Sequence, residues 1–451
     1  MTTLNQTYGY LERLLAPQGR NSNSCDWFEL DSAPDMALLE QAAISVSRRH
    51  AALQAITSLG GKDGWSWRRD PNARPQIHYQ RLPGACPDDA PDRLVRRNIW
   101  EMPLELESGP PWRLHVTEYD DLTILQSVTT HIYTCGKSAN LISVELFRAY
   151  DLLARGLRPD DSPVEVPDRR NTRLFQHNWR AIDHLRAFAG TTVGLMRELF
   201  TSPMKLAGDT TDIAMRGRSR VEFVDLGPEL WRQLRCFARS EGVSRHPFYL
   251  AAWSEALSAY NTRHGMRVGP RVKFMDNFSL RAFSKQNLDG FYDLTAVPYA
   301  IEVPSGPSTR DKRQAIFADV EELRAGKILR ELTRYEIYHN MMRFLPVVLT
   351  TKLLLKMVIK SRFILSNVGP VPPELLINQS LPVRRYFSFP QLFPPGKVML
   401  LINTTPDTVR AIFLWDEDAI GSADMKNELI PGFRTALARS IELPPESTPV
   451  A

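Results

Sequence analysis

Cysteine is scarce in this chain of 451 residues, which contains only Cys25, Cys86, Cys135 and Cys236. The four stand far apart and form no C-x-x-C pair, so the sequence predicts neither a zinc site nor a disulfide framework. Scattered free thiols are typical of a reducing compartment, and we expect the protein in the cytoplasm.

Long hydrophobic runs are also missing. The first ten residues are polar and lack the apolar core of a signal peptide. The most apolar stretch, 344–358, is interrupted by Lys352 and Lys356 and is shorter than the roughly 20 residues that span a bilayer. We therefore interpret it as a core helix rather than a membrane anchor, and we expect no transmembrane segment.

The chain has no strong excess of charge of one sign, with 56 basic and 51 acidic residues and a formal net charge of +5. It contains no Lys/Arg block, so we expect no nucleic acid partner. A mild positive excess can still help to dock an acidic partner. The pairs Arg68-Arg69 and Arg169-Arg170 are candidates for such a contact, although we favour their interpretation as solvated surface.

Several motifs of common enzyme classes are absent. The sequence has no G-x-G-x-x-G after a strand, no G-x-x-x-x-G-K-[ST], no H-E-x-x-H and no G-x-S-x-G. The direct signals for dinucleotide enzymes, P-loop proteins, zincins and serine hydrolases are therefore missing. The nine histidines are scattered without metal-ligand spacing, and we predict neither a metal nor a bound cofactor.

The chain is long enough for two or three domains with a large core. A proline-bearing stretch at 159–167 marks a candidate boundary. We expect an N-terminal lobe over 1–165, a connecting segment over 166–220, a C-terminal lobe over 221–443 and a disordered tail over 444–451. Strands mix with helices without a strict βαβ rhythm, which favours an α/β sandwich.

Local patterns predict many of the elements. In the first half they indicate a helix after Asp35, a hairpin over 55–69, strands at 112–116 and 122–130, and a helix from Ser138 to Ala154. The alternation at 112–117 predicts a strand with two different faces. Later segments predict helices at 174–200, 228–240, 247–261, 309–326, 331–358 and 423–440, and strands at 221–224, 272–275, 362–366, 383–389, 397–403 and 409–415.

The stretch Thr129–Gly136 contains the best candidate for chemistry. His131 stands where a buried type of strand ends and a loop begins, and Gly136 permits a tight turn or a close approach of the backbone. A neutral imidazole there could take a proton from an amine or a hydroxyl. A lone histidine at a strand end is more often a core residue, so this observation is weak by itself.

The stretch resembles the H-H-x-x-x-D-G motif of the chloramphenicol-acetyltransferase-like superfamily, which includes nonribosomal peptide condensation domains, polyketide-associated acyltransferases and wax-ester synthases. Further segments resemble the family in the same order along nearly the whole chain: 48–53, 103–113, 245–253, 366–370 and 395–415. The resemblance implies two chloramphenicol-acetyltransferase-like α/β sandwich lobes that meet in a V, with a tunnel between them and one substrate entering at each face.

The resemblance also implies roles for individual residues. His131 matches the second, catalytic histidine of the motif, while Thr130 replaces the first histidine. Cys135 replaces the aspartate, which in the family pairs with an arginine and shapes the loop. Arg281 is our candidate for that arginine. A thiol cannot accept a bidentate guanidinium bond, so this departure puts the loop, and with it the activity, in doubt.

Other residues have two interpretations each. Cys135 could be a nucleophile activated by His131, but we favour a buried inert thiol. Tyr133 is expected to line the tunnel. Ser366 and Asn367 either donate hydrogen bonds near the reacting carbonyl or to a pantetheine arm, or belong to a strand that only connects the two halves. The aromatic residues at 386, 387, 389 and 393 line an acyl channel or, as we favour, pack in the core.

The family resemblance implies acyl transfer from a thioester to a small-molecule amine or hydroxyl. The donor would be the phosphopantetheine arm of an acyl or peptidyl carrier protein, or coenzyme A, and His131 would act as the general base or orient the nucleophile. One alternative is a wax-ester type of O-acyltransferase that uses acyl-CoA, favoured by segments 344–358 and 191–207. The other is an inactive relative that binds carrier proteins or recruits enzymes, favoured by Cys135. We expect a monomer.

Overall fold

The computed structural model describes residues 5–7, 22–58, 66–164, 172–176, 178–200, 204–209, 219–288, 290, 292, 294–342, 361–392 and 396–442. The predicted apolar helix 344–358, the arginine pair 169–170, the aromatic residue 393 and the expected disordered tail lie outside these residues. Within the described part, no helix is both long and apolar enough to cross a bilayer.

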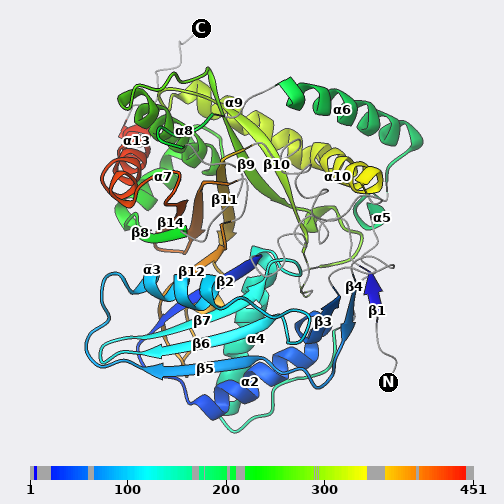
Figure 1. Cartoon of the computed structure of the whole chain (residues 1–451), viewed down its shortest axis with the longest axis vertical. Helices are drawn as coiled ribbons and strands as arrows, with labels where there is room; N and C mark the ends of the chain where they lie inside the picture. The colour runs from blue at the N-terminus through cyan, green and yellow to red at the C-terminus, as the bar shows by residue number, and fades with distance from the viewer. Residues whose placement is uncertain are drawn as a thin grey trace.

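The N-terminal lobe is built on a five-stranded sheet with the order β12-β2-β7-β6-β5. Helix α2 packs against α4, which in turn contacts β2 and β12. Figure 1 shows this lobe in the lower half of the molecule. Its elements are β2 (Asn23–Leu30), α2 (Met36–Arg49), β5 (Gln76–Arg81), α3 (Ala90–Val95), β6 (Trp112–Glu118), β7 (Thr123–Thr130) and α4 (Gly136–Ala154).

A small sheet stands at the side of this lobe, with β4 (Ser66–Arg69) between β1 (Asn5–Thr7) and β3 (Ala55–Ser58). The antiparallel pairing of β3 with β4 confirms the predicted hairpin. Helix α2 also begins as predicted, because Oδ1 of Asp35 accepts hydrogen bonds from the backbone N–H groups of Ala37 and Leu38.

The C-terminal lobe contains a six-stranded sheet with the order β10-β9-β11-β13-β14-β8. Helix α8 packs against both α9 and α13, and these helices lie in the upper half of Figure 1. The strands are β8 (Ser219–Asp225), β9 (Arg271–Ser279), β10 (Ala296–Pro304), β11 (Phe363–Pro370), β13 (Val398–Thr404) and β14 (Val409–Asp416). The helices are α7 (Pro228–Ser240), α8 (His246–Arg263), α9 (Arg310–Glu322), α10 (Ile328–Met342), α12 (Ser422–Asp424) and α13 (Ile430–Glu442).

Two segments link the lobes. Helices α5 (Thr172–Phe175) and α6 (Ala181–Phe200) follow the N-terminal lobe, and α6 packs against α10 of the C-terminal lobe. In the other direction, β12 (Val383–Pro390) leaves the C-terminal half and pairs antiparallel with β2, so the last part of the chain completes the N-terminal sheet. The protein therefore consists of two α/β lobes that share one exchanged strand.

Strand β6 has the two chemically different faces that its sequence predicts, and both faces are buried. The polar side of the strand, Arg113, His115 and Thr117, is covered as completely as the apolar side. Arg113 donates hydrogen bonds to the backbone carbonyls of Asn98 and Met102, so the segment that follows α3 closes over this face. The alternation of apolar and polar residues therefore reflects the different chemistry of the two faces, whereas the segment after α3 causes the burial of the polar face.

Candidate functional site

The motif loop joins β7 to α4 in the N-terminal lobe. Thr130, at the position of the family's first histidine, is the last residue of β7 and is completely buried. Its hydroxyl donates to the carbonyl of Ser22 at 3.1 Å. The backbone N–H of His131 donates to the same carbonyl at 2.6 Å. These two bonds hold the start of the loop to the strand beside it.

The imidazole of His131 is oriented by its own loop. Its Nδ1 lies within hydrogen-bond distance of the carbonyl oxygen of Thr134, and because a carbonyl can only accept, Nδ1 must carry the proton. Nε2 then holds the lone pair and has no hydrogen-bond partner among the described residues. Burial lowers the pKa of His131 below the ordinary value of histidine, although the backbone hydrogen bonds oppose this shift. The side chain is thus a neutral base at neutral pH.

Cys135 is the N-cap of α4 and is 4% exposed. Its Sγ lies 3.6 Å from the hydroxyls of both Ser138 and Thr295, and Nη2 of Arg281 donates to the Ser138 hydroxyl at 2.8 Å. Burial alone would raise the pKa of the Cys135 thiol. The charge of Arg281 and hydrogen bonds from Thr295 and Ser138 outweigh burial, so the pKa lies below its ordinary value.

This arrangement differs from the expected helix start. The helix was predicted to begin at Ser138, but α4 begins two residues earlier, at Gly136, and the Ser138 hydroxyl connects Cys135 with Arg281. The structure therefore brings our candidate arginine, from the other lobe, to the loop where the motif aspartate is missing. A thiol with a lowered pKa stands where the family has a carboxylate.

Replacing Cys135 by Asp is expected to stabilise the protein by about 1–2 kcal/mol, because a carboxylate forms stronger charge-assisted hydrogen bonds than a thiol. Cys135→Ser is the matched control, since it keeps the size but removes the ionisable group. Thermal and denaturant unfolding of both variants and the parent protein measure the effect. A Cys135→Asp variant no more stable than Cys135→Ser would show that Arg281 does not act on this position.

Gly136 of the motif loop lies against the C-terminal lobe. A Cβ at this position would be 2.6 Å from Cγ1 and 3.0 Å from Cγ2 of Val368, which belongs to β11 of the C-terminal lobe. The branched side chain of valine has few alternative rotamers, so it cannot turn away easily. Glycine is therefore required here by contact rather than by backbone conformation.

Gly136→Ala is expected to destabilise the protein by about 1–3 kcal/mol, the typical effect of overpacking. Helix propensity alone would predict the opposite sign, because alanine in a helix is about 1 kcal/mol better than glycine. Adding Val368→Ala should restore most of the stability. Gly190→Ala in α6, where a new Cβ has no neighbour within 4 Å, is the control and should not destabilise. Destabilisation of the double variant equal to that of Gly136→Ala would contradict the proposed clash.

The other predicted site residues have different surroundings. Tyr133 is completely buried, with its hydroxyl 2.5 Å from that of Thr57 and its ring against Trp67, so it packs inside the N-terminal lobe. Ser366 and Asn367 are half-buried in β11. Oδ1 of Asn367 accepts from the backbone N–H of Gly369, which leaves its amide group as the available donor.

The aromatic residues of β12 pack in the core, as we favoured. Tyr386, Phe387 and Phe389 are all buried. The ring of Phe387 stacks on Phe223 of β8 with 4.1 Å between the ring centroids, and Tyr386 donates a hydrogen bond to Oδ1 of Asn140. These contacts tie the exchanged strand to both lobes.

A cavity of about 830 Å³ adjoins the motif loop on the side of the C-terminal lobe. Lys137 of α4, Arg281 and Asn367 line it, whereas His131 is not among its lining residues. Its lining includes an imidazole–carboxylate pair, His246 with Asp276. These two residues are 30 positions apart, so no local pattern singles them out. We call it the His246 cavity.

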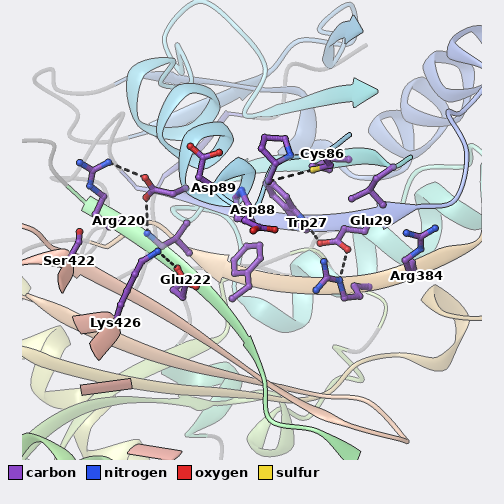
Figure 2. A pocket seen from close by; sticks show the side chains of 18 of the residues that line it. Trp27, Glu29, Cys86, Asp88, Asp89, Arg220, Glu222, Arg384, Ser422 and Lys426 are labelled. Carbon is purple, nitrogen blue, oxygen red and sulfur yellow. Dashed lines mark hydrogen bonds and ion pairs between the residues drawn. The ribbon is translucent and has the colours of Figure 1, made fainter. Parts of the chain in front are cut away.

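A second cavity, of about 890 Å³, lies between the lobes (Figure 2). Arg220 crosses its edge, since Nη1 lies 3.0 Å from Oδ2 of Asp92 in the N-terminal lobe and Nη2 lies 2.8 Å from Oε2 of Glu417. The thiol of Cys86 also lines this cavity, and burial together with nearby carboxylates raises its pKa to about 11. We therefore interpret this cavity as part of the contact between the two lobes, and the Cys86 thiol in it as unreactive.

Across the described ranges, no group of three or more histidine, cysteine or acidic side chains is arranged so that it could hold a metal ion.

Comparison with known proteins gave matches among solved structures alone. No family model matches the chain, and no curated protein does. The first condensation domain of the CDA synthetase superposes with a TM-score of 0.72 at 14% identity, covering 97% of this chain and 96% of that one. The condensation domain of the Monacolin K polyketide synthase MokA gives 0.68 at 13% identity, covering 98% and 99%. The EpoB cyclization-docking bidomain of Sorangium cellulosum gives 0.67 at 15% identity, covering 98% and 86%.

An epimerization domain of tyrocidine synthetase B also superposes, with a TM-score of 0.64 at 12% identity and 98% coverage of both chains. Proteins whose names refer to condensation, cyclization and epimerization thus share one architecture, and architecture by itself does not decide the reaction. What the comparisons establish is the fold: this chain has the two-lobed, chloramphenicol-acetyltransferase-like fold of condensation domains over nearly its whole length.

Proposed function

We propose that this protein is an acyltransferase that moves an acyl group from a thioester to an amine or hydroxyl, with His131 as the general base. The observation that carries the proposal is the orientation of one ring. Nδ1–H of His131 is directed to the carbonyl of Thr134, and Nε2 is left with a lone pair and no partner among the described residues. A positioned imidazole of this kind accelerates proton transfer by about 10²–10⁴-fold.

In the proposed reaction, His131 first accepts a proton and then returns it, so the protein itself needs no cofactor for this step. Nε2 of His131 takes a proton from the acceptor as the acceptor nitrogen or oxygen attacks the thioester carbonyl. The carbon–sulfur bond then breaks, and the imidazolium returns its proton to the departing thiolate. Because a thioester is already activated, holding the two reactants together supplies much of the remaining acceleration.

The donor in this proposal is a carrier-borne phosphopantetheine thioester or acyl-CoA. The names of the superposed proteins support a carrier, since they come from peptide and polyketide synthases. A mild net charge of +5 is compatible with an acidic partner. The acceptor is a small molecule in either case.

The test is a transfer assay with purified protein. Acyl-carrier and acyl-CoA thioesters are each combined with a panel of amines and alcohols, and products are identified by mass spectrometry. Formation of an amide or ester above the rate without protein supports the proposal. Free acid as the only product would show that the protein hydrolyses the thioester instead of transferring the acyl group.

The rate of transfer should depend on pH through His131. Burial lowers the pKa of this group below the ordinary 6.5, and only the neutral imidazole can accept a proton. Activity should therefore fall as the pH is lowered, with a midpoint below 6.5. A profile of kcat/KM against pH, taken with a hydroxyl acceptor whose own charge does not change, locates the midpoint. A midpoint above 6.5 would exclude this histidine as the titrating base.

A second candidate function is binding without catalysis. Cys135 in place of the motif aspartate favours it, because the loop has lost a carboxylate partner for Arg281. In that case the protein would bind a loaded carrier protein with no turnover on any donor. Titration of acyl-carrier protein beside the transfer assay separates the two functions, since only the second predicts binding with no product.

A further inference from the structure

The His246 cavity presents an unusual balance of charge to a ligand. Its ionisable lining residues come from four parts of the fold, namely the start of α4, the start of α8, the segment from β9 to residue 285, and the helical turn Leu323–Lys327 that follows α9. They are Lys137, His246, Asp276, Arg281, Lys285 and Arg324. Among the described lining residues there is thus one carboxylate against four permanent cations.

The single carboxylate is already satisfied by the protein. Asp276 is 2% exposed, and its Oδ2 accepts from Nε2 of His246 at 2.6 Å and from the hydroxyl of Tyr299 at 3.0 Å. Its Oδ1 accepts from the backbone N–H of Asn277 at 2.8 Å. Burial and the charge of Asp276 raise the pKa of Tyr299, so this hydroxyl stays a donor. Asp276 is occupied as an acceptor and orients His246.

The second nitrogen of that imidazole is available. With Nε2 bonded to Asp276, Nδ1 of His246 has no hydrogen-bond partner in the described part of the chain, and the side chain is 12% exposed within the cavity lining. An imidazole nitrogen held this way accepts a hydrogen bond when neutral and donates one when charged. The arrangement fixes the ring and leaves one polar atom for a ligand.

The cations differ in how far the protein neutralises them. Arg324 forms an ion pair with Glu321 at 2.6 Å, and Arg281 donates to Ser138. Lys137 and Lys285 have no ion-pair partner among the described residues. The ammonium of Lys137 also lies beside β11, because a Cβ on Gly369 would be 3.7 Å from it. The positive charge therefore reaches from the motif loop to the far side of the cavity.

We propose that the His246 cavity binds the carboxylate of a free, small-molecule acceptor through Lys137 and Lys285 as counter-charges, while Nδ1 of His246 accepts a hydrogen bond from a donor group of the same acceptor. The inference rests on the proposed function, whose acceptor it specifies. An aminoacyl group on a carrier has no free α-carboxylate, because that carbon forms the thioester. A cavity that recognises a carboxylate is therefore suited to an acceptor in solution.

Binding is measured without catalysis, so that this inference is tested separately from the proposed function. Isothermal titration of the full chain compares the standard L-amino acids with their α-carboxamides, and coenzyme A and inorganic phosphate form separate arms. We expect at least one acid to bind about tenfold or more tighter than its amide, the effect of one charge-assisted hydrogen bond. Equal binding of acid and amide, no binding of any acid, tighter binding of inorganic phosphate, or displacement of the bound acid by coenzyme A would overturn the proposal.

Variants connect that affinity to the cavity. Lys285→Gln should weaken binding of the acid by about threefold or more, whereas Lys205→Gln, the same change at an exposed lysine outside the cavity lining, should not. His246→Gln keeps an N–H group for Asp276 but removes the ring nitrogen Nδ1, and it should also weaken binding of the acid. Equal effects of Lys285→Gln and Lys205→Gln would contradict the site. If the protein binds the acid but catalyses no acyl transfer, that result would contradict the proposed function and leave the carboxylate site in place.

Discussion

Replacing His131 by alanine should reduce kcat/KM for acyl transfer by about 10²–10⁴-fold, the range for a positioned general base. The substitution removes the Nε2 lone pair and the donor to the Thr134 carbonyl. The backbone bond from His131 to Ser22 remains, so the end of β7 should keep its place. Initial rates with saturating donor, together with circular dichroism and unfolding curves, separate lost chemistry from lost structure.

The control for this experiment is His184→Ala. His184 lies on α6, is exposed and packs its ring against Trp179, with 5.1 Å between the ring centroids. The same chemical change there should leave transfer unaltered. Turnover that survives His131→Ala at more than about a tenth of the original rate would remove this imidazole from the role of base. In that case positioning of the substrates alone would account for the rate.

Lys397→Met should destabilise the protein by about 3–5 kcal/mol, the typical effect of removing one partner of a buried ion pair. Nζ of Lys397 lies 2.5 Å from Oδ2 of Asp416, and the two side chains are 1% and 2% exposed. Without the ammonium group, the carboxylate of Asp416 would stay buried without a counter-charge. The free energy of unfolding, obtained from denaturant titration, measures the effect.

Two further variants test whether burial is the cause. Lys426→Met removes an ion pair of similar length, 2.7 Å to Glu222, but its side chains are 51% and 35% exposed. Solvent screens that pair, so this change should alter stability by less than about 1 kcal/mol. The double variant Lys397→Met with Asp416→Asn removes both charges and should recover most of the loss. Equal destabilisation by Lys397→Met and Lys426→Met would refute the explanation by desolvation.

Much of the fold follows from local pattern. The helices α7 and α8, the hairpin of β3 with β4, and the strands β12, β13 and β14 lie close to their predicted ranges. Strand β2 escaped prediction because its sequence contains Asp26 and Glu29, which are both buried. Asp26 accepts from the hydroxyl of Ser143, and Glu29 pairs with Arg385. These partners are 117 and 356 residues away along the chain, beyond the reach of any local pattern.

In the candidate site, too, some features follow from local sequence and others from distant contacts. Neighbouring residues suffice to predict a histidine at the end of a buried strand, followed by a loop with a glycine and a helix. The contacts of Gly136 with Val368 and of Asp276 with His246 are visible only in the folded chain, as is the approach of Arg281, which the family resemblance had suggested, to Cys135. Burial, charge neutralisation and close contact depend on residues that are distant in sequence, and folding alone brings those residues together.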